Sequence, residues 1–185
     1  MTIPMERRLL PIGVFHIDTN LINARQNLKA VNQLEKWFDD GVILINMSGT
    51  AHIEAQAGGN VARARKANRQ IFTITPAADP SSPAYRRIEN ALFPEGARTE
   101  SERNDVRIVC DAAHYAATLV TGDGGSKSQP GGILGNRQKV ANLVRILSPD
   151  ECVEFIRGKI RERDDFNARV AKEFGGEVPE WTGQD

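Results

Sequence analysis

The sequence predicts an α/β domain of three layers, α/β/α, with a central parallel sheet. Short apolar segments alternate with longer segments whose apolar residues recur every three or four positions, which is the pattern of strands followed by helices. Such alternation favours a parallel sheet, because right-handed crossovers return the chain to the same end of the sheet. At 185 residues, 40% of them hydrophobic, the chain can bury the core of one domain.

The first predicted strand and helix lie near the start of the chain. Residues 12–17 (IGVFHI) form a short run of apolar, branched and aromatic residues, as a buried strand does. Asp18 ends this run, and Asn20 can cap a helix that follows. The apolar residues of that helix share one face and stop before Gly41: Leu21, Ala24, Leu28, Val31, Leu34 and Phe38.

A second strand and a second helix follow. Residues 42–47 (VILINM) are another apolar run typical of a buried strand. Ser48 and Thr50 offer caps for a short helix that carries His52 and Glu54. The opening of the chain is therefore predicted to be strand, helix, strand, helix.

The middle of the chain is less regular. The pattern favours helices over residues 60–69 and 85–93, and residues 70–75 fit either a short strand or an extended link. The proline- and serine-rich stretch 74–83 and the polar stretch 94–103 have the composition of loops.

Regular structure is predicted again from residue 104. Residues 106–117 have the apolar spacing of a helix, and residues 118–121 (TLVT) form a third strand. A loop rich in glycine and serine runs to about residue 132, and residues 144–147 (VRIL) are the fourth strand.

The last predicted element is a long helix. Ser148, Pro149 and Glu151 supply the cap, the first-turn proline and the third-position glutamate of a capping box. The helix is expected to run to about Phe174, and the tail 177–185 is expected to fray.

The chain shows no internal repeat and no obvious linker between two cores. We therefore expect one domain over residues 1–150, with a carboxyl-terminal helix and tail over residues 151–185 that packs on it or extends from it.

Charge and cysteine content narrow the class of protein. Lys plus Arg and Asp plus Glu both number 24, which argues against nucleic-acid binding by net charge alone. Cys110 and Cys152 do not form a C-x-x-C pair, and free thiols suit a reducing cytoplasm. No signal peptide and no stretch long enough to cross a bilayer is evident, so the expectation is a cytoplasmic protein without a membrane partner.

Four carboxylates are predicted to meet at one edge of the sheet. Asp18 and Asp123 follow the first and third strands, and Glu54 lies shortly after the second. Ligands of open α/β sheets bind at the carboxyl ends of the strands. Asp105 lies at the predicted start of the helix that runs back to the third strand, and therefore at the same edge. Asp111 lies six residues deeper, about 9 Å along the helix, so we expect it to be a supporting or surface group.

A divalent cation would explain why so many carboxylates gather. Crowded carboxylates repel one another and raise one another's pKa unless a positive charge compensates. Mg²⁺ or Mn²⁺ prefers such oxygen ligands. The three histidines are scattered, and His16 within an apolar strand is more typical of a core than of a metal site. The predicted metal ligands are Asp18, Glu54, Asp105 and Asp123.

These segments resemble the PIN-domain family of metal-dependent ribonucleases. The resemblance lies in HIDTNLI around Asp18, in a glutamate after the second strand, and in NDVRIVCDAAHYAATLVTGDGG, which holds Asp105 and Asp123. It implies that the four carboxylates are the family's acidic quartet, with Asn20 and Thr121 as polar helpers. It also implies an Mg²⁺-dependent endoribonuclease that hydrolyses RNA phosphodiester bonds, the toxin role of a toxin–antitoxin pair, and an antitoxin protein as partner.

Several alternatives stay open at the level of sequence. One is a catalytically silent PIN-like module that binds RNA or protein, and another is a related fold that cleaves DNA or flap structures. A phosphatase of the haloacid-dehalogenase type is excluded, because position 20 is Asn where that chemistry needs a second acid. The last helix could support a homo-oligomer or extend freely into solvent.

Basic residues form two clusters in the sequence. Their side chains could contact RNA phosphates, or they could be exposed to solvent without a binding role. The first cluster shares one predicted helix: Arg63, Arg65, Lys66 and Arg69. The second follows the third strand: Lys127, Arg137 and Lys139.

Overall fold

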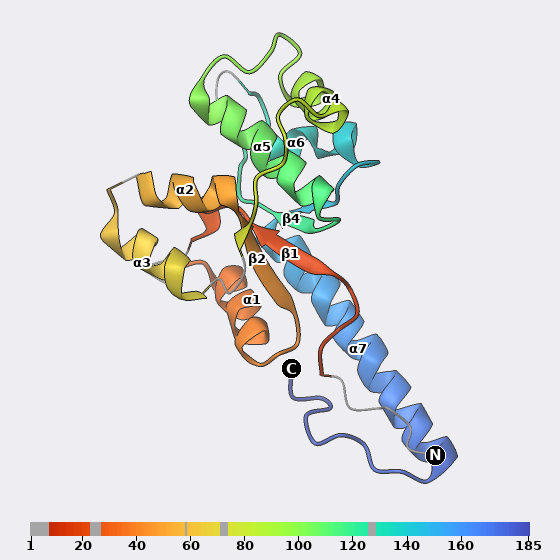
Figure 1. Cartoon of the computed structure of the whole chain (residues 1–185). Coiled ribbons are helices and arrows are strands. Elements are labelled where there is room, and N and C mark those ends of the chain that lie inside the picture. The colour runs from red at the N-terminus through yellow and green to blue at the C-terminus, as the bar shows by residue number, and fades with distance from the viewer. Residues whose placement is uncertain (1–7, 23–26, 58, 71–73, 126–128) are drawn as a thin grey trace.

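A parallel sheet forms the centre of the computed structural model, which describes residues 8–22, 27–57, 59–70, 74–125 and 129–185. The sheet has five strands in the order β3-β2-β1-β4-β5, and all neighbouring pairs are parallel (Figure 1). The strands are β1 (Val14–Ile17), β2 (Leu44–Ser48), β3 (Ile74–Thr75), β4 (Thr118–Val120) and β5 (Ile146–Leu147). The predicted fold class is confirmed.

Helices connect the strands and cover both faces of the sheet (Figure 1). In the described part of the chain they are α1 (Lys29–Asp39), α2 (Gly49–Ala57), α3 (Val61–Gln70), α4 (Pro83–Leu92), α5 (Glu100–His114), α6 (Gly132–Asn136) and α7 (Pro149–Phe174). Two short 3₁₀ helices, η1 (Thr19–Leu21) and η2 (Arg137–Val140), complete the set. The long helix predicted after Ser148 is confirmed, including its capping box.

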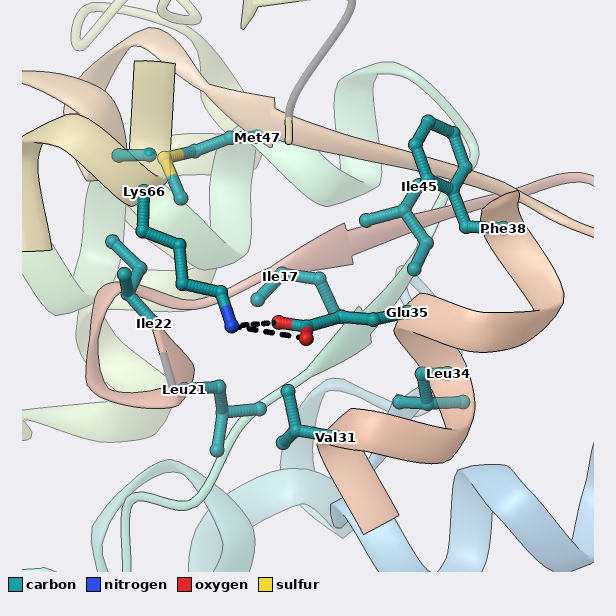
Figure 2. A pocket seen from close by; sticks show the side chains of 11 residues that line it. Ile17, Leu21, Ile22, Val31, Leu34, Glu35, Phe38, Ile45, Met47 and Lys66 are labelled. Carbon is teal, nitrogen blue, oxygen red and sulfur yellow. Dashed lines mark hydrogen bonds and ion pairs between the residues drawn. The ribbon is translucent and has the colours of Figure 1, made fainter. Parts of the chain in front are cut away.

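One face of the sheet packs against α1 and the first half of α7. Phe15 of β1, Trp37 of α1 and Ile156 of α7 are among its fully buried residues. Beside this core lies an apolar pocket of about 40 Å³, and Glu35 and Lys66 form an ion pair across it (Figure 2). The salt bridge therefore ties α3 to α1.

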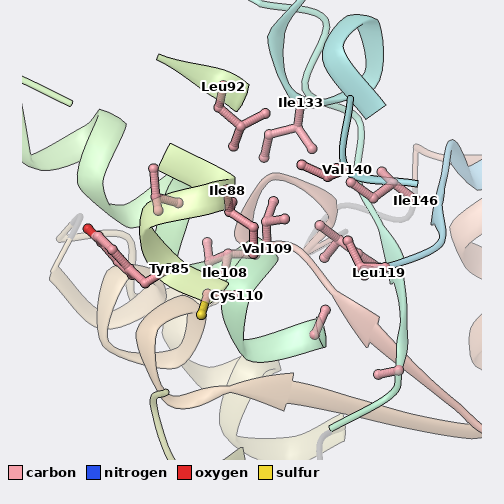
Figure 3. Packing of buried hydrophobic residues seen from close by; sticks show 14 of the residues in the cluster. Tyr85, Ile88, Leu92, Ile108, Val109, Cys110, Leu119, Ile133, Val140 and Ile146 are labelled. Carbon is pink, nitrogen blue, oxygen red and sulfur yellow. The ribbon is translucent and has the colours of Figure 1, made fainter. Parts of the chain in front are cut away.

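The other face packs against α4, α5, α6 and η2 (Figure 3). Ile88, Val109 and Leu119 are fully buried there. Cys110 belongs to this cluster as a free thiol and packs there as a small buried hydrophobic residue. The described residues include no helix that is both long and apolar enough to span a membrane.

The helix predicted to begin after Asn20 begins later. The chain instead forms η1, and α1 starts at Lys29. The physical reason is that the Asn20 side chain is bonded elsewhere: its Oδ1 accepts from Gly122 N at 3.1 Å and its Nδ2 donates to Asp18. Ala24, which was predicted to lie on the apolar face of this helix, lies outside the described residues.

Helix α5 begins earlier than predicted. The expected loop 94–103 ends in a capping box in which Thr99 Oγ1 accepts from Glu102 N, so the helix starts at Glu100. Asp105 therefore lies in the second turn of α5 and not at its first residue. Thr99 and Glu102 have the spacing of a capping box in the sequence, and the polar composition of this segment concealed that signal.

The prediction that residues 177–185 fray is wrong. The guanidinium of Arg163 lies 4.4 Å from the ring centroid of Trp181, and its Nη2 donates to Asp185 at 2.8 Å. Arg8 Nε also donates to Asp185, at 2.9 Å. The tail thus returns along α7 and is held by charge-assisted hydrogen bonds.

Asp185→Asn is expected to lower the free energy of unfolding by about 2 kcal/mol, because the side chain is fully buried between two guanidinium groups. Burial raises the pKa of Asp185, but hydrogen bonds from Arg8 and Arg163 outweigh it and lower the pKa below 3.8. The stabilisation is therefore present at neutral pH and is lost as the pH falls below about 4. Urea unfolding at two pH values measures it, with the exposed Glu180→Gln as control. Equal midpoints for Asp185→Asn and wild type would contradict the prediction.

Candidate acidic site

The four carboxylates predicted from the sequence line one pocket at the carboxyl ends of the strands. Asp18 follows β1, Asp123 follows β4, Glu54 comes from α2 and Asp105 from α5. The pocket has a volume of about 230 Å³. Its other lining residues are polar or glycine: Thr19, Asn20, Thr99, Ser101, Glu102, Gly125 and Gln129. No basic side chain lines it among the described residues.

Asp18 is held by hydrogen bonds from two side chains. Its Oδ2 accepts from Thr121 Oγ1 at 2.5 Å and from Asn20 Nδ2 at 2.9 Å. The residue is almost fully buried, and this burial raises its pKa to about 6. The hydrogen bond from Thr121 opposes the rise, and the charges of Glu54 and Asp123 add to it. Asn20 and Thr121, expected as polar helpers, therefore both orient Asp18.

Asp123 is fixed by the loop that follows it. Its Oδ1 accepts from Gly125 N at 3.0 Å, and its Oδ2 accepts from Ile133 N at 2.7 Å. Thr121 Oγ1 also accepts from Asp123 N at 3.0 Å, so one hydroxyl connects this residue to Asp18. The sequence predicted only a flexible loop here, because the partners of the carboxylate are backbone amides.

Gly132 makes this arrangement possible. Its φ is +56°, and an added Cβ would lie 2.4 Å from Asp123 Oδ2 and 2.4 Å from Gly125 N. A side chain at this position would displace the carboxylate or break the loop. Gly132 is therefore important for the site, although in the sequence it is only one of several glycines in a loop rich in glycine and serine.

Gly132→Ala is therefore expected to lower the melting temperature in the absence of metal and, if the pocket holds the predicted ion, to reduce the stabilisation that Mn²⁺ gives. The loss without metal reflects the positive φ and is about 1–2 kcal/mol. Gly135→Ala is a matched control in the same helix, because a Cβ there meets no atom within 4 Å. Thermal unfolding with and without Mn²⁺ separates the two variants. An unchanged Mn²⁺ response in Gly132→Ala would show that the position of Asp123 does not depend on this glycine.

Glu54 is positioned by a neighbour of Asp18. Thr19 Oγ1 donates to Glu54 Oε2 at 2.7 Å, and it also lies 3.2 Å from Ala51 O. Thr19 is buried and connects η1 to α2. The sequence analysis did not single out Thr19, although it lies next to Asp18 in the chain.

Asp105 has the most strongly perturbed carboxyl group of the pocket. Its pKa is raised to about 8, chiefly by burial and in smaller part by the negative charges of Asp123, Asp18, Glu54 and Glu102. Its pKa therefore reports that several carboxylates lie within electrostatic range of one another. Glu102 is an additional acidic residue of the pocket that the sequence analysis missed.

The type of donor fits a hard divalent cation. All four predicted ligands carry carboxylate oxygens, which Mg²⁺ and Mn²⁺ prefer. Burial is the main cause of the raised pKa values of Asp18 and Asp105, and the neighbouring carboxylates contribute to them. Within the described ranges, however, no three acidic, histidine or cysteine side chains are already arranged to hold a metal ion together. Both oxygens of Asp123, and Oδ2 of Asp18, accept hydrogen bonds from the protein. The role of the four as metal ligands stays a prediction.

Asp111 and His16 lie outside this pocket. Asp111 is fully buried, and its Oδ1 accepts from Ala78 N at 2.5 Å, so it is a structural residue and not a surface group. His16 is also buried, and burial lowers its pKa to about 4, so it stays neutral. Neither of its ring nitrogens has a hydrogen-bond partner among the described residues, so it is a core residue without the expected partners.

The basic clusters are partly engaged within the protein. Lys66 forms the ion pair with Glu35 at 2.7 Å (Figure 2), and Arg137 forms two hydrogen bonds with Glu151. Lys127 and the side chains of Arg63 and Arg69 lie outside the described residues. A role of either cluster in binding RNA stays a prediction.

Comparison with known proteins identifies the fold. No family model matches the chain, and no curated protein matches it. The chain is similar to a chain of VapBC2 from Rickettsia felis, solved bound to a DNA fragment from its promoter, with a TM-score of 0.50 and 16% identity over 73% of this chain and 98% of that chain. It is also similar to a chain of FitAB bound to the IR36 DNA fragment, with a TM-score of 0.47 and 20% identity over 73% and 94% of the two chains. The protein thus has a PIN-domain-like fold.

Proposed function

We propose that this protein is an Mg²⁺-dependent endoribonuclease that hydrolyses RNA phosphodiester bonds, with Mn²⁺ as an alternative ion. The observation that carries the proposal is the meeting of four carboxylates from four separate segments in one pocket of a PIN-domain-like fold. Asp18, Glu54, Asp105 and Asp123 would hold the ion. When bound, it would polarise the scissile phosphate and lower the pKa of a bound water.

The acidic side chains of the pocket favour the binding of a cation over that of a phosphate without a cation. Thr121 and Asn20 hold Asp18, and the backbone amides of Gly125 and Ile133 hold Asp123, so both carboxylates are fixed at the wall of the pocket. Since no basic side chain lines the described pocket, an RNA phosphate would enter only after the negative charge has been compensated.

We also propose that the protein acts as the toxin of a toxin–antitoxin pair, with an antitoxin protein as partner. This role is supported by the fold it shares with a chain of VapBC2, which belongs to a toxin–antitoxin complex. The alternative is a catalytically silent PIN-like module that binds RNA or protein. RNA cleavage distinguishes the two candidates, whereas RNA binding does not, because a silent module could also bind RNA.

The test compares RNA and DNA oligonucleotides with the purified protein under Mg²⁺, Mn²⁺ or EDTA. We expect RNA cleavage only with a divalent ion, and a loss of at least about a hundredfold in Asp18→Asn and Asp123→Asn. The exposed Asp150→Asn serves as control. Mn²⁺ binding without cleavage of varied RNAs would support the silent module, and full activity in both variants would refute the nuclease.

A further inference from the structure

The open edge of the sheet at β5 lies in a groove away from the acidic pocket. β5 is the last strand in the sheet order and pairs only with β4 among the described strands. The groove has a volume of about 520 Å³ and lies between η2 and the first two turns of α7. Residues on both sides of the sheet plane line it: Arg137, Gln138, Ala141, Val144, Arg145, Ile146, Leu147, Glu151 and Phe155.

The hydrogen-bonding groups of one residue of β5 point toward this groove. Leu119 N donates to Arg145 O at 2.9 Å, and Thr121 N donates to Leu147 O at 3.1 Å. In a parallel strand, the backbone groups of the intervening residue point to the opposite side. The N–H and C=O of Ile146 therefore face away from β4, while its side chain packs into the core (Figure 3).

The groove carries a net positive charge. Arg137 and Glu151 neutralise each other through two hydrogen bonds, at 2.5 and 2.8 Å. Hydrogen bonds from Arg137, and then from the Ser148 backbone, lower the pKa of Glu151 to about 2, so this pair stays fully ionised. Arg145 is exposed, and its guanidinium carbon lies 5.0 Å from the ring centroid of Phe155. Among the described residues it forms no ion pair. It is the cation of the groove that remains available to a partner.

The two faces of the groove differ in chemistry. Arg145 and Leu147 lie on the face covered by α7, beside Phe155, whereas Val144 and Ile146 point to the opposite face. A strand added beside β5 would place alternate side chains on these two faces. Acidic residues would meet Arg145 on one face, and small apolar residues would meet Ala141 on the other.

We propose that this groove binds an extended peptide of a partner protein in which acidic and apolar residues alternate, as an added strand beside β5. The backbone N–H and C=O of Ile146 would form hydrogen bonds with the peptide backbone, and Arg145 would favour acidic side chains in the peptide. The site is independent of the nuclease function. Because β5 is short, the affinity for an isolated peptide is modest, on the order of 100 µM.

The probe is a fluorescein-labelled peptide of sequence Ser-Val-Glu-Val-Glu-Val-Ser, titrated against the full chain by fluorescence anisotropy. We expect saturable binding to the wild-type chain and a Kd at least about fivefold higher for Arg145→Glu. Arg161→Glu is the control, because it reverses an exposed charge on α7 outside the groove, and its Kd is expected to equal that of wild type. Versions with Lys in place of Glu, or with Pro in place of the central Val, are expected to bind more weakly. Amide exchange is expected to slow at Ile146 when the acidic peptide is bound.

Three results would overturn the proposal. The first is the absence of binding up to about 1 mM peptide. The second is equal affinity of wild type and Arg145→Glu for the acidic peptide, with no protection of the Ile146 amide. The third is self-association of the wild-type chain that Arg145→Glu abolishes, which would identify a second copy as the occupant. The metal-dependent stability of Arg145→Glu is expected to equal that of wild type, so failure here is distinguishable from failure of the proposed nuclease site.

Discussion

Replacing Asp105 by asparagine is expected to abolish metal-dependent RNA cleavage and, at the same time, to stabilise the metal-free protein above neutral pH. The loss of activity follows if Asp105 is one of the metal ligands, and we expect a decrease of at least about a hundredfold. The gain in stability follows from electrostatics alone. A carboxylate that is buried, and that also lies near Asp123, Asp18 and Glu54, is unfavourable without a cation.

The sign of the stability change follows from the two pKa values. Asp105 titrates with a pKa of about 8 in the folded protein against an ordinary 3.8. Between these values the folded state retains a proton that the unfolded state releases, so the free energy of unfolding falls as the pH rises through this range. Asparagine carries no charge at any pH. The melting temperature of Asp105→Asn should therefore exceed that of wild type by roughly 3–6 °C near pH 9, and the two should converge near pH 4.

The measurement is a series of thermal unfolding curves from about pH 4 to about pH 9, in EDTA and in Mn²⁺. Wild type should gain stability from Mn²⁺ and Asp105→Asn should gain little, which reverses their order. Asp165→Asn, an exposed change on α7, is the control. Parallel curves for Asp105→Asn and wild type at all pH values would show that the carboxylates do not interact as the structure indicates.

Asp111→Ala is expected to differ from Asp105→Asn in both respects: it should lose much stability and have no direct effect on the acidic pocket. The side chain is fully buried, and its Oδ1 accepts from Ala78 N at 2.5 Å. Burial raises its pKa, and the hydrogen bond from Ala78 N opposes the rise. Alanine would leave this donor without an acceptor inside the core. We expect the free energy of unfolding to fall by about 3 kcal/mol.

Asp111→Asn provides the matched comparison. Its amide keeps one oxygen that can accept from Ala78 N and removes the buried charge, so we expect less than half of the loss seen with alanine. Urea unfolding measures both variants, and the stabilisation by Mn²⁺ tests whether the pocket survives. If Asp111→Ala retained wild-type stability but lost its response to Mn²⁺, Asp111 would belong to the metal site and its structural role would be wrong.

The sequence by itself determined the order of the elements and the edge of the sheet at which the acidic residues meet. Alternating apolar runs and helical stripes are short-range patterns, so β1, β2, β4 and α7 could be predicted from them. Asp18 directly follows β1 and Asp123 lies shortly after β4, and this local fact is enough to place both at the carboxyl edge of a parallel sheet.

Only the tertiary structure decided how the side chains are held. The bond from Gly122 N to Asn20 Oδ1 joins residues 102 positions apart, and the Thr121–Asp18 bond spans 103 positions. Such contacts depend on β1 lying next to β4, and no local pattern encodes that order. The same holds for the tail, where Asp185 meets Arg8 across 177 positions and is ordered by a partner that is remote in the chain. Local periodicity reflects the backbone of each segment, whereas the partner of a polar group depends on which segments the whole fold brings together.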